Sequence, residues 1–435
     1  MASSPTSLWH TLIHLRGNPR ACVWTEPMWG LSMALVLPYL SVFMLTLGLH
    51  DAQIGLLATA GMISQVVFGL AGGIITDRMG RRLTNAVFDV IAFVIPCLIW
   101  AFAQDFWAFL AASLLNGALQ VTANAWDCLM VEDAERDQIT GIYSLVRVAA
   151  DCSALFAPIA AFMVAQFGLE PAVRVLFINA AVVMLAKIIL LYAASTETRQ
   201  GRIRMEETRH ESLWRLFVGY REAAKLLGRS HGSLLALAIA ALVAAVTLVN
   251  GTFWQILVNQ HLHVPDPVLP FFPMVRSLLS VLFLFTLIRR LTSGHDLRLA
   301  SLWGFGIYLA GQVVLVAIPA GDGVAGPVTY ALLGVCLLLD GFGAGMLFML
   351  SESLVAFHVD EAERSRVMAL QRTVVMLAAA PFGWISGWLS GIDRTYPFWL
   401  TSALLVIGVI TTIVWWAGPH TEPPVEAEPE SVNRA

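Results

Sequence analysis

An arginine and an aspartate, Arg147 and Asp151, lie four residues apart in the otherwise apolar stretch 138–167. Residues four apart share one face of a helix, so their side chains can pair along it. An ionisable group near the centre of a bilayer costs at least ~2.5–3.5 kcal/mol and is therefore a functional candidate. We expect the pair to face a central cavity, where Asp151 exchanges a proton or binds a cationic group and Arg147 holds its charge. A neutralised pair that only fixes packing is the alternative.

A second carboxyl group, that of Asp340, stands in another apolar stretch without a charged neighbour along its own predicted helix. A carboxyl group in such surroundings is a candidate proton carrier. It is equally able to pair with Arg276 or Arg372, which lie in other apolar stretches. The sequence leaves both interpretations open.

Polar side chains in two further apolar stretches are candidates for contact with a substrate. Asn250, Trp254 and Gln255 lie close together in one stretch, and Asn116 and Gln120 lie four apart in another. They offer hydrogen bonds and one stacking face. Such residues also serve as packing contacts between membrane helices, and this is the alternative for each of them.

Other charged residues lie nearer the predicted membrane boundaries, and we expect them to be structural: Glu26, Asp89 and Glu352. The long side chain of Lys187 is able to snorkel, that is, to bury its stem while its amino group reaches the membrane surface.

Three glycines, Gly383, Gly387 and Gly391, recur at every fourth position of one apolar stretch. Small residues at this spacing are typical of membrane helices that approach closely. We expect these glycines to have a structural role.

The composition restricts the class of protein. Of 435 residues, 58% are hydrophobic and only 13% are charged, whereas an average soluble domain is about 25% charged. A cytosolic enzyme, a secreted domain and a disordered scaffold are therefore excluded, and a polytopic membrane protein remains. The five cysteines stand singly. No nucleotide-binding, metal-ligand or nucleophile motif occurs, so we expect no enzyme activity, no cofactor, no metal and no nucleic-acid partner.

The apolar stretches are long enough for twelve membrane helices, at about 20 residues for each crossing. A window of about 19 residues places them near 28–49, 52–76, 84–103, 106–131, 138–167, 171–195, 232–260, 267–288, 298–319, 326–355, 365–391 and 396–417. The expected fold class is therefore an all-α membrane protein.

The positions of lysine and arginine orient these helices. Twenty of the 26 basic residues fall in segments on one side of the predicted membrane, and two, Arg174 and Arg394, fall on the other. Basic segments are held on the cytoplasmic side. We expect both termini to be cytoplasmic.

A long basic segment divides the chain into two sets of six helices. Its apolar residues between Leu213 and Leu227 have helical spacing, which predicts an amphipathic helix. Two similar hexapeptides, beginning at Val131 and Val359, follow the fourth and tenth helices and support a repeat, a transporter architecture. The expected parts are a cytoplasmic segment 1–27, a six-helix bundle 28–195, a cytoplasmic linker 196–231, a second bundle 232–417 and a disordered tail 418–435.

The loop between the second and third predicted helices carries the motif with the strongest signal. It reads Gly73-Ile-Ile-Thr-Asp77-Arg78-Met-Gly80-Arg81-Arg82. This resembles the G-x-x-x-D-R-x-G-R-R signature of the major facilitator superfamily, and every fixed position is matched. The resemblance implies two pseudo-symmetric six-helix bundles around a substrate site near the middle of the membrane. The alternative is that the arginines only fix the topology.

In the family this loop latches the two halves together on the cytoplasmic side, so the resemblance implies a gating role for the motif residues. Family members also use an acidic residue at the inner end of the fourth helix as a partner of the loop, and Asp127 is placed for that role. The corresponding segment of the second half, from Arg289 to Asp296, is degenerate.

Two further comparisons concern the direction of transport. The fifth helix carries small residues around Ala157-Pro158, where antiporters of the family carry a glycine-rich pattern. This favours export and the twelve-helix drug:proton antiporter-like branch. The arginine of the family's fourth helix falls at Ser113 and is missing, so a mechanism that depends on it does not carry over.

The expected function is secondary active transport of a small organic molecule by alternating access, with efflux coupled to protons. Proton-coupled uptake of a metabolite or sugar is the first alternative, and a membrane sensor or lipid-handling protein without transport is the second. We expect a monomer in a lipid bilayer, namely a bacterial inner membrane. Its partners are then the small-molecule substrate and protons.

Overall fold

The computed structural model describes residues 12–135, 138–209, 231–286, 297–320, 323–358 and 364–417. Every regular element in these ranges is a helix. Lipid offers no hydrogen bonds to the backbone, so apolar stretches of this length satisfy their own backbone groups as helices. The predicted all-α fold class is confirmed.

The amino-terminal half contains six crossings, several of which are built from two or three consecutive helical segments. They are α2 (Gly17–Val36) with η1 (Leu37–Tyr39) and α3 (Leu40–Thr46); α4 (Asp51–Met79); α5 (Arg81–Asp89) with η2 (Val90–Val94) and α6 (Ile95–Phe102); α7 (Phe106–Asn116) with α8 (Leu119–Val131); α9 (Ile139–Ser153) with η3 (Ala154–Phe156) and α10 (Ala157–Phe167); and α11 (Leu169–Ala194).

A short helix, α12 (Arg199–Thr208), follows this half. The carboxy-terminal half then consists of α14 (His231–Ile256) with η4 (Leu257–His261), η5 (Asp266–Val268), α15 (Phe271–Thr286), α17 (Leu297–Ala317), α18 (Pro327–His358), α19 (Arg364–Ile392) and α20 (Tyr396–Ala417).

Within the described residues, eleven crossings are long and apolar enough to span a membrane. The helix α15 lies where the eighth of the twelve predicted spans was placed, and 16 of its residues are described. Many large apolar side chains are exposed on the outer faces, including Phe102, Trp107 and Val182. Such faces suit contact with lipid.

The first helix begins at Gly17, well before the predicted start at Met28. The extension has a tertiary cause, because Cys22 and Val23 are buried in a cluster with apolar residues of α8 and α11. The side-chain amide of Asn18 also donates to the carboxylate of Asp133 and to the carbonyl of Thr196. These contacts hold the first turns of the helix, which the hydropathy of the segment alone did not predict.

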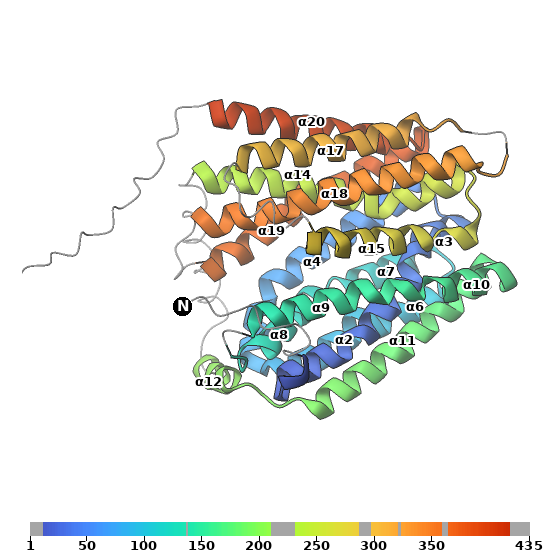
Figure 1. Cartoon of the computed structure of the whole chain (residues 1–435). Helices are drawn as coiled ribbons and strands as arrows, with labels where there is room; N and C mark the ends of the chain where they lie inside the picture. The colour runs from blue at the N-terminus through green and yellow to red at the C-terminus, as the bar shows by residue number, and fades with distance from the viewer. Residues whose placement is uncertain are drawn as a thin grey trace, which may run out of the picture.

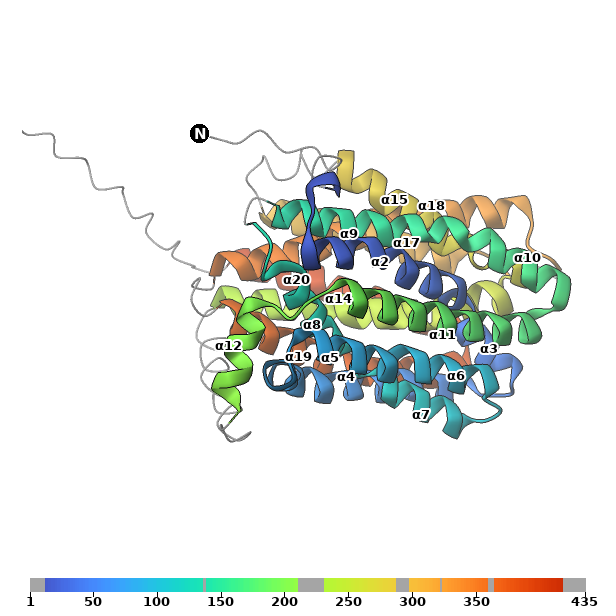
Figure 2. The same ribbon diagram turned by 90° about the horizontal axis from the view of Figure 1, so that it is seen from below.

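The long helices run side by side in one bundle, with the amino-terminal half and the carboxy-terminal half as neighbouring layers (Figures 1 and 2). The short α12 lies across one end of this bundle (Figure 2). We call that end the α12 end and the other the opposite end. The basic motif between α4 and α5 lies at the α12 end, which the arginine distribution predicts to be cytoplasmic. The two halves meet mainly where α4 packs on α19 and α14, and where α9 and α10 pack on α15.

Candidate functional site

A cavity of about 730 Å³ lies between the two halves. Its wall comes from all six crossings of the amino-terminal half and from α14, α15 and α18 of the other half. Most of the lining is apolar or aromatic. The amide and guanidinium groups on the wall belong to Gln65, Asn116, Asn250, Gln255 and Arg276.

The structure brings several of the predicted substrate-binding side chains to this wall. Asn250, Trp254 and Gln255 of α14 and Asn116 of α7 all line it. Asn116 donates to the carbonyl of Ala92, at 2.8 Å, so its amide also holds two segments together. The side-chain oxygens of Asn250 and Gln255 are buried and accept no hydrogen bond from the described part of the chain. A ligand in the cavity could use either oxygen as an acceptor only after the amide turns toward the cavity.

Gln120 was predicted to lie with this group, and the structure places it outside the wall. Its amide nitrogen donates to the side-chain oxygen of Gln65, at 3.1 Å, and Gln65 does line the cavity. Gln120 therefore acts on the cavity only through Gln65. Its role in substrate binding stays a prediction.

The carboxylate of Asp340 faces Arg276, with 3.8 Å between Oδ2 and Nη2. Of the two arginines that the sequence allowed as partners of Asp340, Arg276 and Arg372, the structure therefore places Arg276 against it. Asp340 is 1% exposed, and it also accepts two hydrogen bonds from the amide of Gln312, at 3.0 and 3.1 Å. Gln312 accepts in turn from Thr401, at 2.8 Å. The carboxylate that looked solitary in the sequence is thus the centre of a network that reaches the cavity through Arg276.

The pair Arg147 and Asp151 forms as predicted, with 2.9 Å between Nε and Oδ2. Neither residue is among those that line the cavity, so the position predicted for the pair, facing the cavity, stays a prediction. The helix pair α9 and α10 contributes Ala150 and Ala157 to the wall. The Arg147 side chain is 55% exposed and the Asp151 side chain is 12% exposed.

The prediction that Lys187 snorkels is also wrong. The residue is 4% exposed, and its Nζ lies 2.9 Å from Oδ2 of Asp89, which is 1% exposed. The other oxygen of Asp89 accepts a hydrogen bond from Thr122, at 2.6 Å, and Thr122 accepts one from Asn85. A buried carboxylate within reach outweighs the distant membrane surface as a partner for the amino group.

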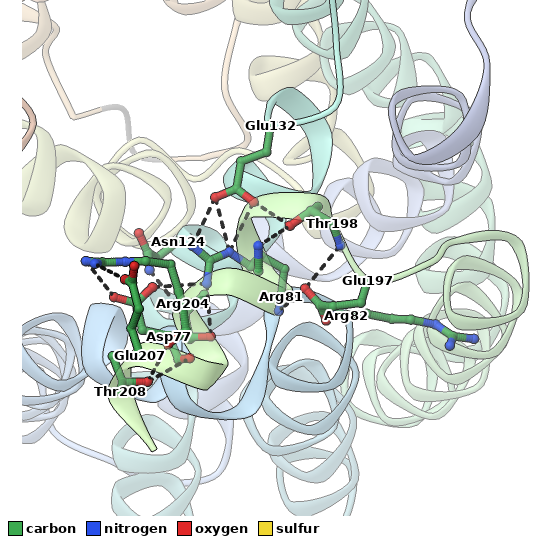
Figure 3. A network of polar contacts seen from close by, with 12 residues as sticks. Asp77, Arg81, Arg82, Asn124, Glu132, Glu197, Thr198, Arg204, Glu207 and Thr208 are labelled. Atoms are coloured by element: carbon green, nitrogen blue, oxygen red, sulfur yellow. Dashed lines mark hydrogen bonds and ion pairs between the residues drawn. The ribbon is translucent and has the colours of Figure 1, made fainter. Parts of the chain in front are cut away.

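The motif at the α12 end forms a dense polar network (Figure 3). Arg81 donates from Nε and Nη2 to the carboxylate of Glu132 and from Nη1 to Asp77, with 3.0 Å for the shortest contact to each. Its side chain is only 5% exposed. Gly80 precedes it with φ of +83°, a conformation that side chains disfavour. The glycine lets the chain turn so that the guanidinium reaches both acids.

The acidic partner of the loop differs from the predicted one. Asp127 was expected, but the structure places the carboxylate of Glu132 against Arg81, with 3.0 Å between Oε1 and Nη2. Asp127 lies five residues before Glu132 along the chain, which is more than one turn of a helix. Glu132 belongs to the first of the two repeated hexapeptides, and this was the signal in the sequence that marked it.

The segment that joins the halves docks on the same loop. Glu197 accepts hydrogen bonds from the backbone N–H groups of Arg81 and Arg82, at 2.9 and 3.1 Å. A carboxylate in this position caps the start of α5 and complements its dipole. Arg204 of α12 lies 3.4 Å from Asp77. Sequence reasoning missed these contacts, because the partners are far apart along the chain.

The side chain of Arg81 allows a test of this network. A lysine cannot reproduce the two-pronged contact of a guanidinium with Glu132. We expect Arg81→Lys to destabilise the protein by about 1–3 kcal/mol, since it leaves a half-satisfied carboxylate in a mostly buried site. Thermal melting of the purified protein measures this.

The matched control for this test is Arg204→Lys in the same network. The Arg204 side chain is 42% exposed, so we expect its replacement to change stability by about 0–1 kcal/mol. Equal melting temperatures for the two variants would contradict the role given to Arg81.

At the opposite end the halves are in direct contact. A Cβ atom added to Gly387 of α19 would lie 2.8 Å from Cα of Gly55 in α4, so the helices touch through their backbones. Ser390 donates to the carboxylate of Asp51, at 2.6 Å, and Arg394 lies 3.7 Å from the same group. The predicted close helix contact is confirmed for Gly383 and Gly387. For Gly391 it is wrong, because no described atom lies within 4 Å of a Cβ added there.

Some predicted features lie outside the described residues. These are the amphipathic helix between Leu213 and Leu227, the degenerate segment from Arg289 to Asp296, the second hexapeptide up to Glu363, and the tail 418–435. Among the described side chains, no group of three or more histidine, cysteine or acidic residues is placed to hold a metal ion.

Residues 28–295 match the sequence model of a family described as Major Facilitator Superfamily. The quinolone resistance protein NorA of Staphylococcus aureus strain N315 is 29% identical over 87 residues. That match covers 20% of this chain and 22% of NorA, so the chain spans about a fifth of the length of the curated relatives it matches.

Solved structures resemble nearly the whole chain. A mutant of the nucleoside transporter NupG has a TM-score of 0.73 at 14% identity and covers 91% of this chain and 100% of its own. A POT family transporter in complex with 5-aminolevulinic acid has a TM-score of 0.67 at 12% identity, with coverage of 91% and 95%. The human organic anion transporter MFSD10 has a TM-score of 0.62 at 16% identity, with coverage of 90% and 98%. At these identities the likeness shows the fold alone.

Proposed function

Because the chain belongs to the major facilitator superfamily, and is thus a multi-pass membrane transporter rather than an enzyme, we propose that it is a proton-coupled efflux transporter. It exports a small organic molecule by alternating access, with protons moving in the opposite direction. The domain limits predicted above, cytoplasmic termini, a monomeric state and a bacterial inner membrane are parts of the same proposal.

The observation that carries this proposal is the cavity between the halves. Its size of about 730 Å³ is in the usual range for small-molecule sites. An apolar wall with a few amides and one guanidinium suits an amphipathic molecule that hydrogen-bonds at a few points. The amide side chains of Asn250 and Gln255 line the cavity, and Trp254 offers an aromatic face on the same helix.

Alternating access requires that each end of the bundle opens in turn. At the opposite end the halves are joined where α19 touches α4 through Gly387 and Gly55. At the α12 end, the motif loop is bound to Glu197 and Arg204 of the linker. The first of these contacts joins the two halves, whereas the second joins the motif loop to the linker. Together they support a conformation in which the halves are joined at the opposite end.

The case for efflux rests on the drug-antiporter resemblance and on NorA, a quinolone resistance protein. Uptake is the second candidate, because NupG is a nucleoside transporter and other structural neighbours are peptide transporters. A membrane protein without transport is disfavoured, because the structure has a cavity of about 730 Å³ between the halves, and neither Asp151 nor Asp340 lines it.

The test uses the purified full-length protein in proteoliposomes that enclose a pH-sensitive dye. A quinolone, a nucleoside and a dipeptide are added in turn, and proton flux is recorded. We expect a quinolone to trigger proton movement opposite to its own. Proton movement in the same direction as a nucleoside or dipeptide would favour uptake instead, and folded protein that moves none of the three would contradict the proposed substrate class.

A further inference from the structure

We propose that the substrate of the cavity is an aromatic molecule that carries a carboxylate, and that Arg276 of α15 is the residue that binds this group. The inference rests on the proposed function and names the chemical class of the substrate at the same cavity. Its support is the charge of the cavity wall, the unequal exposure of Arg276 and Asp340, and the aromatic side chains along the wall.

The charge of the cavity wall comes from a single side chain. Of the described residues that line the cavity, Arg276 is the one with a charged side chain, and none is an aspartate or a glutamate. Charges act more strongly on one another in apolar surroundings than in water. A ligand with a carboxylate is therefore attracted by this wall, and a ligand with a positive charge is repelled by it.

The carboxylate of Asp340 compensates the charge of Arg276 without occupying its donors. Oδ2 of the aspartate and Nη2 of the arginine are 3.8 Å apart, whereas a hydrogen bond between two charged groups measures about 2.7–2.9 Å. The two oxygens of Asp340 instead accept hydrogen bonds from the amide of Gln312. A nearby carboxylate lowers the cost of a guanidinium in an apolar wall, so Asp340 is a positioning residue for Arg276.

The two members of this ion pair differ in their exposure. The Arg276 side chain is 42% exposed and that of Asp340 is 1% exposed, so a ligand can reach the guanidinium but not the carboxylate. In the described part of the chain, none of the N–H groups of this guanidinium donates a hydrogen bond. A guanidinium has five such groups, and two of them match the two oxygens of a carboxylate. The donors for one carboxylate are therefore available at the wall.

Three pairs of aromatic side chains line the same cavity. They are Trp29 with Phe93, Trp100 with Phe177, and Trp254 with Phe272, with ring centroids 6.4, 5.6 and 5.0 Å apart. Phe272 lies one helical turn before Arg276 on α15, so the two side chains share a face of the helix. Aromatic rings pack favourably edge to face or offset against a further ring. An aromatic carboxylate can thus place its ring beside Phe272 and Trp254 while its charged group meets Arg276.

Calorimetric titration of the full-length protein in lipid nanodiscs tests this inference without transport. Three ligands share one naphthalene ring and differ in charge at neutral pH: 2-naphthoate is negative, its methyl ester is neutral and 2-naphthylmethylammonium is positive. Empty nanodiscs supply the blank for ligand that enters the lipid. We expect 2-naphthoate to bind the wild type roughly 10- to 150-fold more tightly than the ester, the range for a hydrogen bond to a charged group. The ammonium ligand should bind most weakly.

Three variants separate the charge of Arg276 from the stability of the fold. Arg276→Gln with Asp340→Asn removes both charges at once, so no buried carboxylate is left without a cation, and it should abolish the preference for 2-naphthoate over the ester. Asp340→Asn alone removes the competing carboxylate and should tighten the binding of 2-naphthoate. The matched control is Arg199→Gln, which removes the same charge from an exposed position of α12 and should bind all three ligands as the wild type does.

Three outcomes would overturn the inference: no preference of the wild type for 2-naphthoate over its ester, tightest binding of the ammonium ligand, or a preference for 2-naphthoate that persists in the double variant. The comparison of the three ligands on the wild type needs no variant. It therefore decides the question even if a substitution prevents folding.

The proteoliposome flux assay keeps this result apart from the proposed function. A preference for 2-naphthoate without proton flux for any tested compound would support the carboxylate site and count against proton-coupled transport. Proton flux driven by a quinolone, with no preference for 2-naphthoate, would support the proposed function and count against Arg276 as the carboxylate site.

Discussion

Replacing Lys187 by methionine is expected to destabilise the protein by about 3–5 kcal/mol, because it leaves a buried carboxylate without its cation. Lys187 and Asp89 are 4% and 1% exposed and lie 2.9 Å apart. Methionine keeps most of the volume of the lysine stem, so the change removes the charge and creates little cavity. Resistance of the purified protein to denaturant, measured beside the wild type, reports the effect.

Two variants make this prediction specific. The double variant Lys187→Met with Asp89→Asn removes both charges and should recover a large part of the loss, since neither charge is then left unpaired. The single variant Glu170→Gln removes the half-exposed acid of the pair with Arg174, and this ion pair contributes about 0–1 kcal/mol. If Lys187→Met were as stable as the wild type, the ion pair with Asp89 would not stabilise the fold. The prediction that Lys187 snorkels would then apply again.

The second large effect is expected from Gly387→Leu, where α19 touches α4. A Cβ at Gly387 would lie 2.7 Å from the carbonyl oxygen of Asp51 and 2.8 Å from Cα of Gly55. Both atoms belong to backbone, so the helices must separate. Inserting a side chain into such a contact costs typically about 1–3 kcal/mol, which corresponds to roughly a 5- to 150-fold shift between two conformations. We expect transport to fall by a comparable factor.

Crosslinking measures the separation directly. Asp51 and Ser390 are hydrogen-bonded at the same contact, so Asp51→Cys with Ser390→Cys should crosslink readily when the exposed Cys152 is replaced by serine. Adding Gly387→Leu should slow the crosslink. Gly391→Leu is the matched control, with the same substitution one turn away and no described atom within 4 Å. Crosslinking that is equal in both backgrounds would argue against a rigid contact at Gly387.

These two contacts concern different parts of the proposed cycle. The Lys187 pair stabilises the interior of one half, whereas the Gly387 contact joins one half to the other at the opposite end. A stability assay should therefore respond most to Lys187→Met, and a conformational assay should respond most to Gly387→Leu. The inverse pattern would mean that the two roles are assigned the wrong way round.

The sequence by itself determined the class of protein, the positions of its helices and its family. Hydropathy depends on consecutive residues, and a stretch of about 20 apolar residues has few structural options in a bilayer. The motif from Gly73 to Arg82 is equally local, and the match over 28–295 confirms the family that it indicated. Arg147 and Asp151 pair as predicted because four residues along a helix fix their separation.

Only the tertiary structure decided which distant groups meet. Glu132 replaces Asp127 at Arg81, Asp89 holds Lys187 inside, and Arg276 faces Asp340. In each case the partners lie on different helices. Which of them meet depends on the rotation of each helix about its axis and on its neighbours. The pattern of apolar residues fixes this rotation poorly in a membrane, because lipid-facing and core-facing surfaces are both apolar.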